Sequence, residues 1–237
     1  MSEQESEPVQ ETVEEIETGD ITVETSADPV LPDLTEANRN FLGTAYRIQV
    51  GMILIALAIG GFLTTPPWKL FEWSQPALLL GTLGTLPLAL FMLFLELLPF
   101  EGLRRIQDLL VHKVAPLVAD ATVKKLFVLA LLVGVGEELI FRGIVQNFLM
   151  VHIDVHLAIL ISSIIFAFCH FISPTYIILV FGISLYLGYS SIWFSNNAEM
   201  NLVPPILIHT FYDFFAFLYI LHKYKVKLRE EEERTKT

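Results

Sequence analysis

Apolar residues gather along the chain in runs that are long enough to cross a lipid bilayer as helices. Such runs cover residues 48–65, 77–100, 126–150, 156–172, 176–194 and 202–221. Roughly 17–25 apolar residues span a membrane as a helix, and Pro66 and Pro67 mark the end of the first run. The pattern therefore predicts an all-α integral membrane protein with about six transmembrane helices.

Charged residues assign the loops between these runs to the two sides of the membrane. Residues 101–125, between the second and third runs, alternate charged and apolar positions and contain five Lys and Arg. We expect a partly helical interfacial segment here, broken near Pro116. With six spans, these bases share one side with Arg39, Arg47 and the C-terminal bases, and only Lys69 lies on the other. Because cytoplasmic loops are enriched in Lys and Arg, both termini are predicted to be cytoplasmic.

Composition agrees with a membrane protein and sets the two ends of the chain apart. Hydrophobic residues make up 54% of the sequence, above the roughly 45–50% typical of soluble domains. Residues 1–38 hold twelve of the 26 acidic residues and no Lys or Arg, which predicts a disordered acidic tail. The rest divides into N-terminal helices with the interfacial segment (39–122), a membrane core (123–222) and a charged C-terminal tail (223–237). The compact size and short loops favour a bacterial inner membrane.

One predicted span contains charges that are costly to bury in a membrane. Glu137, Glu138 and Arg142 lie within the third run. A charged side chain at mid-membrane costs a few kcal/mol or more, so such residues face the protein interior and indicate function. Glu138 and Arg142, four residues apart, form a favourable helical ion pair. Glu137 points about 100° away from Glu138 and is free for chemistry. The alternative is a purely structural lock between helices, although a lock needs balanced charge.

Small residues and one further acid add to the polar pattern of the predicted spans. Gly134, Gly136 and Gly143 flank the charges of the third run. Glycines at these positions predict that other helices approach closely. Glu96 lies near the far end of the second run, where we expect it to reach the lipid headgroups.

Two other predicted spans each bring an imidazole into the membrane. Phe166 precedes His170 by four residues in the fourth run, and His209 precedes Asp213 by four in the sixth. This spacing puts each pair on one helix face. A single membrane histidine is as often a satisfied hydrogen bond between helices. Three helices that each present an acid or an imidazole instead predict one shared site, open toward the cytoplasm, with Phe166 packed against His170.

In their order on successive membrane helices, these residues resemble a known family. They are similar to the three motifs of the CPBP intramembrane proteases, which include the CAAX prenyl endopeptidases and bacterial abortive-infection proteins. The motifs read Glu137-Glu138-x-x-x-Arg142, Phe166-x-x-x-His170 and His209-x-x-x-Asp213. The resemblance covers residues 123–217, the predicted membrane core. It implies hydrolysis of a peptide bond within or beside the membrane.

The resemblance also implies a role for each motif residue. Glu137 would act as the general base on a water molecule, and His170 would help to hold and activate that water. His209, with the residue at Asp213, would stabilise the tetrahedral oxyanion. The ion pair of the first motif and the aromatic residue of the second would support the shape of the site.

The third motif departs from the family pattern, which often has Asn where this chain has Asp213. An amide can donate a hydrogen bond to an oxyanion, but an ionised carboxylate cannot. Asp213 is therefore either protonated or acts by orienting His209. A third alternative is a divalent metal such as zinc, held by Glu137, His170, His209 and Asp213. No cofactor is favoured, because two imidazoles and one free glutamate already provide a base and donors.

These observations favour an intramembrane endopeptidase whose partners are membrane lipid and a protein or peptide substrate, lipidated in CAAX-type relatives. The alternative is a non-catalytic membrane scaffold or immunity protein. A proton-coupled transporter is less favoured, because the sequence has no evident inverted halves or broken helices. No nucleic-acid partner is expected. The single cysteine, Cys169, excludes an internal disulfide and a cysteine-based metal cluster.

Overall fold

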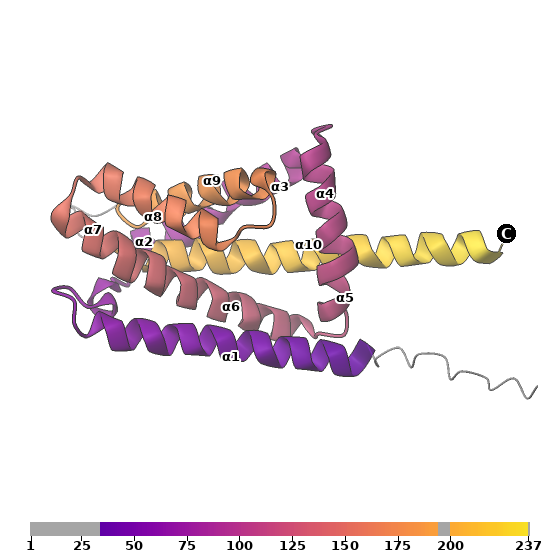
Figure 1. The fold of residues 1–237 in the computed structure, drawn as a ribbon, viewed down its shortest axis with the longest axis horizontal. Coiled ribbons are helices and arrows are strands. Elements are labelled where there is room, and N and C mark those ends of the chain that lie inside the picture. The colour runs from indigo at the N-terminus through magenta and orange to yellow at the C-terminus, as the bar shows by residue number, and fades with distance from the viewer. Residues whose placement is uncertain (1–33, 194–199, 237) are drawn as a thin grey trace, which may run out of the picture. The chain divides into compact units, whose positions relative to one another are not determined.

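The structure, a computed structural model, describes residues 34–193 and 200–236, and every regular element among them is a helix (Figure 1). The α-helices are α1 (Leu34–Gly60), α2 (Gln75–Leu83), α3 (Thr85–Leu95), α4 (Glu101–Leu109), α5 (Ala115–Val118), α6 (Val123–Ile140), α7 (Asn147–His152), α8 (Val155–Cys169), α9 (Pro174–Ser190) and α10 (Val203–Lys236). Three shorter segments are η1 (Pro67–Leu70), which is a 3-10 helix, and η2 (Leu110–Val114) and η3 (Phe141–Gln146), which are π-helical. The predicted all-α class is confirmed for these residues.

Helix α6 occupies the centre of this bundle. It packs along α1 on one side and along α10 on the other, while α8 pairs with α9. Helix α10 also contacts α2, α3 and α9. Figure 1 shows α1, α6 and α10 running roughly side by side, with α4 crossing them near the end where α10 projects. The predicted membrane core is thus built around two neighbouring helices, α6 and α10, which carry the first and third motifs.

Polar side chains in the sequence determine where several helices begin. The Thr122 side chain accepts a hydrogen bond from the backbone N–H three residues later at the start of α6, at 3.4 Å. The Asp154 side chain likewise accepts a hydrogen bond at 2.9 Å from the backbone N–H two residues later in α8. The Ser173 side chain accepts one at 3.2 Å from the backbone N–H three residues later in α9. Such caps satisfy N–H groups that have no partner within the helix. The helices of the membrane core therefore begin where the sequence supplies an oxygen.

Several predicted boundaries differ from the structure. Residues 1–33 of the predicted tail lie outside the described residues, but α1 begins at Leu34, so the end of that tail is helical. The second run ends as a helix at Leu95, five residues early. The predicted break near Pro116 is wrong. The helix continues into α5, and the change in backbone geometry is the π-helical segment η2 directly before the proline.

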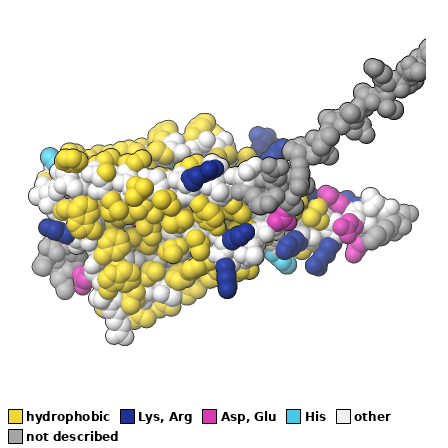
Figure 2. All heavy atoms as spheres, turned by 90° about the horizontal axis from the view of Figure 1, so that it is seen from below, with side chains coloured by type: hydrophobic (Ala, Val, Ile, Leu, Met, Phe, Trp, Pro, Cys, Tyr) yellow, Lys and Arg dark blue, Asp and Glu magenta, His cyan; other side chains and the backbone are white. Residues whose placement is uncertain are grey.

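In the part of the chain that the structure describes, three helices are long and apolar enough to cross a membrane, namely Asn40–Gly60, Gln75–Leu95 and Val203–Thr235. Helices α8 and α9 are apolar but shorter, with 15 and 17 residues. Figure 2 shows hydrophobic side chains over most of the face in view, with acidic and basic side chains gathered where α10 projects. The fold is therefore of a membrane-spanning type, while the count of six spans remains a prediction.

The glycines of the charged stretch are contact points between helices, as predicted. A Cβ atom at Gly134 would lie 3.0 Å from the backbone nitrogen of Thr210 and 3.2 Å from the carbonyl oxygen of Ile206, both in α10. A Cβ atom at Gly136 would lie 3.3 Å from the backbone oxygen of Gln49 in α1, whereas one at Gly143, in η3, would meet side-chain atoms of Pro67 in η1 at 3.0 Å. Because backbone cannot move aside as a side chain can, these positions let α6 lie close to its neighbours.

We predict that Gly134→Ala lowers the melting temperature of the detergent-solubilised protein. The added methyl group meets backbone atoms of α10, and such overpacking typically costs ~1–3 kcal/mol. Gly182→Ala is the matched control, because no heavy atom lies within 4 Å of a Cβ atom at that helical position. The control should be neutral or stabilising, since alanine is favoured over glycine in a helix by roughly 0.5–1 kcal/mol. Equal melting temperatures would contradict the close packing of α6 on α10.

Candidate active site

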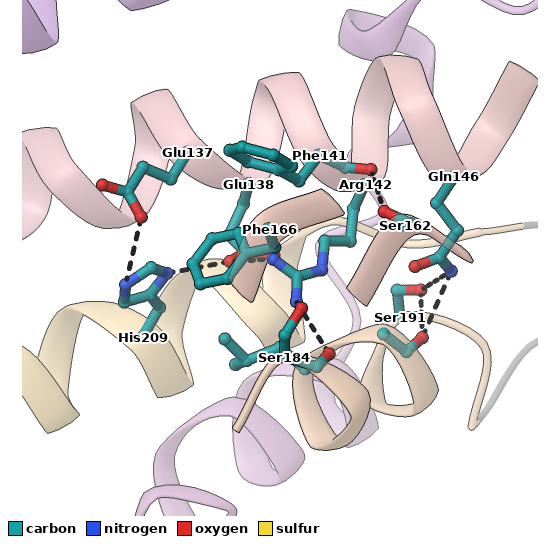
Figure 3. A network of polar contacts seen from close by, with 12 residues as sticks. Glu137, Glu138, Phe141, Arg142, Gln146, Ser162, Phe166, Ser184, Ser191 and His209 are labelled. Carbon is teal, nitrogen blue, oxygen red and sulfur yellow. Dashed lines mark hydrogen bonds and ion pairs between the residues drawn. The ribbon is translucent and has the colours of Figure 1, made fainter. Parts of the chain in front are cut away.

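The charged stretch of α6 is anchored by a buried ion pair (Figure 3). Arg142 Nη1 donates to Glu138 Oε1 at 2.9 Å, and the two side chains are 1% and 0% exposed. Arg142 Nη2 donates to the carbonyl oxygen and the hydroxyl of Ser184 in α9, at 2.8 and 2.9 Å. A buried charge is tolerated when it is paired and hydrogen-bonded. The ion pair expected from the spacing is therefore present, and it also fastens η3 to α9.

Glu138 fixes the ring of His209 in α10 at the same time. His209 Nδ1 lies 2.8 Å from Glu138 Oε1, the oxygen that also accepts from Arg142. Because a carboxylate paired with a guanidinium is an acceptor only, Nδ1 is the donor in this contact. The other ring nitrogen, Nε2, then faces away from the ion pair. The sequence did not predict that one glutamate would serve both partners.

The neighbouring Glu137 faces two imidazoles. Its Oε2 atom lies 3.6 Å from His170 Nε2 and 3.8 Å from His209 Nε2. Its side chain is 11% exposed, whereas that of Glu138 is 0% exposed. The three groups come from α6, from the end of α8 and from α10. The structure thus brings together the acid and the two imidazoles that the sequence predicted to share one site.

Phe166 holds His170 in position. His170 Nδ1 donates to the Phe166 carbonyl oxygen at 2.8 Å, and the two rings stack with centroids 4.4 Å apart. A carbonyl oxygen only accepts, so this contact leaves Nε2 to face Glu137. The Phe166 ring also lies 5.0 Å from the guanidinium carbon of Arg142, within the range of a cation–π contact. Phe166 packs as predicted and links the ion pair to the imidazole.

Asp213 lies next to the outward nitrogen of His209. Its Oδ2 atom is 3.5 Å from His209 Nε2, and its side chain is 23% exposed. This position differs from the alternative in which Asp213 orients His209 from behind, because the Nδ1 side of the ring is taken by Glu138. The spacing of four residues along α10 places Asp213 one turn nearer the open part of the site. Asp213 and Glu137 therefore face the same ring nitrogen.

A cavity of about 730 Å³ borders these groups. Pockets for small molecules are typically ~300–1,000 Å³ and mainly apolar. Its wall includes the site residues of all three motifs and mainly apolar side chains from α3, α4, η2 and α9, among them Phe91, Leu103, Ile106, Val111 and Ile183. The site is thus open on one side to a largely apolar space.

A second ion pair lines a more distant part of this cavity. Lys223 Nζ of α10 lies 3.0 Å from Glu96 Oε1, just after α3, and Gln107 of α4 lies 3.5 Å from the same oxygen. Glu96 was expected to reach the lipid headgroups; its pairing with Lys223 was not predicted and arises because α4 and α10 both approach the end of α3. Lys223 follows His209 by fourteen residues, roughly 21 Å along a helix at 1.5 Å per residue. The cavity therefore reaches from the buried site to a charged part of α10.

The metal alternative has limited support in the geometry. Among the residues that the structure describes, no group of three or more His, Cys, Asp and Glu side chains is arranged to hold a metal ion. The donor types of Glu137, His170, His209 and Asp213 would still suit zinc. The metal-free interpretation therefore stays a prediction.

Two hydroxyl-bearing residues of α9 complete the site and were not predicted from the sequence. Ser184 accepts from Arg142, and Tyr176 lines the cavity beside the motif residues. Both lie in an uncharged apolar run in which their spacing matches no motif. The available signal for Ser184 was weak: small hydroxyl residues in membrane helices often form hydrogen bonds across helices.

The fold and the site together define a helical membrane protein with an acid–imidazole cluster at the wall of a mainly apolar cavity. Residues 120–215 match a family model described as Type II CAAX prenyl endopeptidase Rce1-like. This segment contains all three motifs, so the resemblance to the CAAX-type membrane proteases is confirmed over these residues. No curated protein and no solved structure matches the chain.

We predict that Arg142→Gln sharply lowers the yield of folded protein and its melting temperature. The change leaves the Glu138 carboxylate buried without its cation, which typically costs ~3–5 kcal/mol. Arg105→Gln is the matched control, because Arg105 pairs with Glu101 at the same spacing but with side chains 76% and 78% exposed. Such surface pairs contribute only ~0–1 kcal/mol. Similar losses in the two variants, measured by size-exclusion profile and thermal unfolding, would contradict the anchoring role of the buried pair.

Proposed function

We propose that the chain is an intramembrane endopeptidase in which Glu137 activates a water molecule for hydrolysis of a peptide bond. The observation that carries this proposal is the Glu137 carboxylate facing the imidazoles of His170 and His209 at the cavity wall. The family match over residues 120–215, whose description names a prenyl endopeptidase, supports the same class of reaction.

Glu137 suits the role of general base because its neighbour Glu138, and not Glu137 itself, is engaged by the buried guanidinium. In the proposed step, Glu137 Oε2 takes a proton from water while the water oxygen bonds to the substrate carbonyl carbon. The electron pair of the carbonyl double bond moves to its oxygen, which becomes an oxyanion. When the C–N bond breaks, Glu137 returns the proton to the amine nitrogen. The products are one carboxylic acid and one amine, and Glu137 is regenerated.

The two imidazoles have different tasks in this proposal. His170, held through Nδ1 by the Phe166 carbonyl, presents Nε2 to the water beside Glu137. His209, held through Nδ1 by Glu138, presents Nε2 toward the developing oxyanion. An N–H on that nitrogen means an imidazolium, which lies among the carboxylates of Glu137, Glu138 and Asp213. Donors that are fixed in advance stabilise an oxyanion most strongly where water is sparse.

The cavity supports a substrate that has an apolar part next to its cleavage site. Its wall is mainly apolar between the motif residues and the Glu96–Lys223 pair. A lipidated peptide, the substrate type that the description of the matching family suggests, would place its lipid against this wall and its peptide bond at Glu137. The proposed partners are therefore membrane lipid and a lipidated peptide or protein.

The proposed enzyme crosses the membrane about six times, with both termini on the cytoplasmic side. The three long apolar helices provide three of these spans. Helix α6 with η3 and α7, and the shorter α8 and α9, would provide the others, because they pack against these spans and enclose the site. The distribution of Lys and Arg supports this orientation, and a bacterial inner membrane is the proposed location.

We predict that Glu137→Gln abolishes cleavage but leaves the protein folded. The probe is an internally quenched peptide with a prenylated CAAX terminus, offered to the purified chain in proteoliposomes. Loss of a general base typically lowers the rate ~10²–10⁴-fold, whereas the isosteric amide should leave the melting temperature unchanged. Glu101→Gln, at an exposed carboxylate, is the control and should cleave normally. Retained cleavage by Glu137→Gln would refute the assigned base.

The scaffold alternative makes a different prediction for cells. A non-catalytic membrane protein would keep its biological effect when Glu137→Gln and His209→Ala are introduced and the protein still inserts. An endopeptidase would lose it in both variants. The same difference can be measured without knowledge of the substrate by comparing membrane proteomes of cells with and without Glu137. Peptide termini that cleavage creates should be missing where Glu137 is replaced.

We predict that removal of divalent metals leaves cleavage of the prenylated probe unchanged. The base and the donors in the proposed step are all side chains of the protein, so extensive dialysis against a strong chelator should not lower the rate. The measurement compares kcat before dialysis, after it, and after zinc is added back. A loss that zinc restores would overturn the metal-free mechanism in favour of the metal alternative.

A further inference from the structure

The proposed oxyanion is short of one donor. His209 Nε2 can provide one hydrogen bond, but Asp213, at the position where an amide was expected, provides none when ionised. An oxyanion hole works by aiming donors at the oxygen on which charge develops. A second donor would be an uncommitted O–H or N–H group on the cavity wall that Glu137 and Asp213 line.

Tyr176 meets this description. It is the third residue of α9 and lines the same cavity as Glu137, His209 and Asp213. Its ring packs against the cluster that contains Phe166, and its backbone N–H donates to the cap that begins α9 at 3.2 Å. The ring and its backbone are thus fixed by contacts that do not involve the hydroxyl group.

The Tyr176 side chain is half-buried at the wall of the cavity that Glu137 and Asp213 also line. Within residues 40–193 and 200–235, its backbone N–H forms a hydrogen bond and its hydroxyl forms none. An electrostatic interaction with the carboxylates of Asp213 and Glu137 agrees with this position. Tyr212 also lines the cavity, and its interactions are with Asp213 and with Tyr176. Of the two phenols, Tyr176 is therefore the one that interacts with both acids of the site.

We propose that Tyr176 Oη donates the second hydrogen bond to the oxyanion, in place of the amide that Asp213 does not supply. This inference rests on the proposed peptidase function and adds a catalytic residue to it. A phenol suits the task because it carries one O–H donor on a rigid ring with few rotatable bonds. Because no hydrogen bond among the described residues engages this hydroxyl, it is free to donate to the oxyanion when substrate binds.

The proposed contact adds no proton transfer to the reaction. As the water oxygen bonds to the carbonyl carbon, the carbonyl oxygen gains the electron pair, and the Tyr176 O–H donates a hydrogen bond to that oxygen. When the C–N bond breaks, the electron pair returns to the carbonyl and the hydrogen bond weakens. Tyr176 keeps its proton throughout, and Glu137 alone carries the proton from water to the amine nitrogen.

The first test is Tyr176→Phe with the prenylated, internally quenched peptide in proteoliposomes. The substitution keeps the ring and its packing and removes only the donor. Loss of one oxyanion donor typically lowers kcat ~10²–10³-fold, and KM should stay as it is because the interaction forms in the transition state. Tyr189→Phe is the matched control on the same helix, since its hydroxyl lies near His156, 3.2 Å away, and outside the cavity. It should cleave normally.

The second test separates a donor from a packing residue. Asp213→Asn places an amide donor where the carboxylate stood. In that background, the fold loss of kcat caused by Tyr176→Phe should be about tenfold smaller than in the original chain. The reason is that the effects of two groups that serve the same oxygen are not additive. A purely structural tyrosine would show the same loss in both backgrounds, which would overturn the proposal.

The third test uses binding and does not require turnover. The probe is the same prenylated peptide with a phosphinate in place of the scissile amide, a mimic of the tetrahedral intermediate. Tyr176→Phe should weaken binding of the phosphinate ~10²-fold. In the Glu137→Gln background, which does not cleave, the same substitution should leave binding of the amide peptide unchanged. Equal effects on both ligands, or none, would overturn the role of Tyr176 while cleavage by the original chain still stands. Absence of both cleavage and phosphinate binding by the original chain would instead overturn the proposed function itself.

Discussion

The site depends on one oxygen atom, Glu138 Oε1, which accepts from Arg142 on its own helix and from His209 on α10. A carboxylate without any exposed surface would be strongly disfavoured if it were alone. Two charge-assisted contacts compensate for its lost hydration, and both come from groups that the site needs in fixed places. The contact that makes the burial of charge tolerable therefore also determines the distance between α6 and α10 and the direction of the His209 ring.

This arrangement separates two chemically identical neighbours. Glu137 and Glu138 differ by about 100° of rotation around the helix axis, and that rotation turns Glu138 into the dry interior and Glu137 toward the cavity. The π-helical segment η3 follows directly, as such segments often do at functional sites. The backbone change in η3 is supported by Ser162, whose hydroxyl donates to the Phe141 carbonyl oxygen at 3.0 Å (Figure 3). Local geometry, rather than residue type, decides which glutamate can meet water.

Contacts within one helix of the site could be predicted from the sequence, whereas contacts between segments far apart in the chain could not. The spacing of four from Glu138 to Arg142 and from His209 to Asp213 has a direct helical meaning, so both pairs could be predicted. The contact of His209 with Glu138, across 71 positions, has no such local signal. The pairing of Glu96 with Lys223 was missed for the same reason, because Lys223 belongs to a helix whose path could not be known from local pattern. The span count also stays a prediction, since burial among other helices relaxes the length and hydrophobicity that a lone membrane helix requires.

For the proposed hydrolysis, a site among apolar helices must admit water and a peptide bond while the buried Glu138–Arg142 pair stays shielded from water. In lipid, irregular backbone is tolerated only where it is buried in protein or lines a cavity, so a cleavable segment needs an enclosed space beside the base. Here the space lies on the Glu137 side of α6, and its wall reaches the Glu96–Lys223 pair. The Glu138–Arg142 pair lies on the other side, against Ser184 of α9. In the proposed mechanism, water in the cavity would therefore reach Glu137 and both outward imidazole nitrogens, whereas Glu138 and Arg142, on whose contact their positions depend, do not line the cavity.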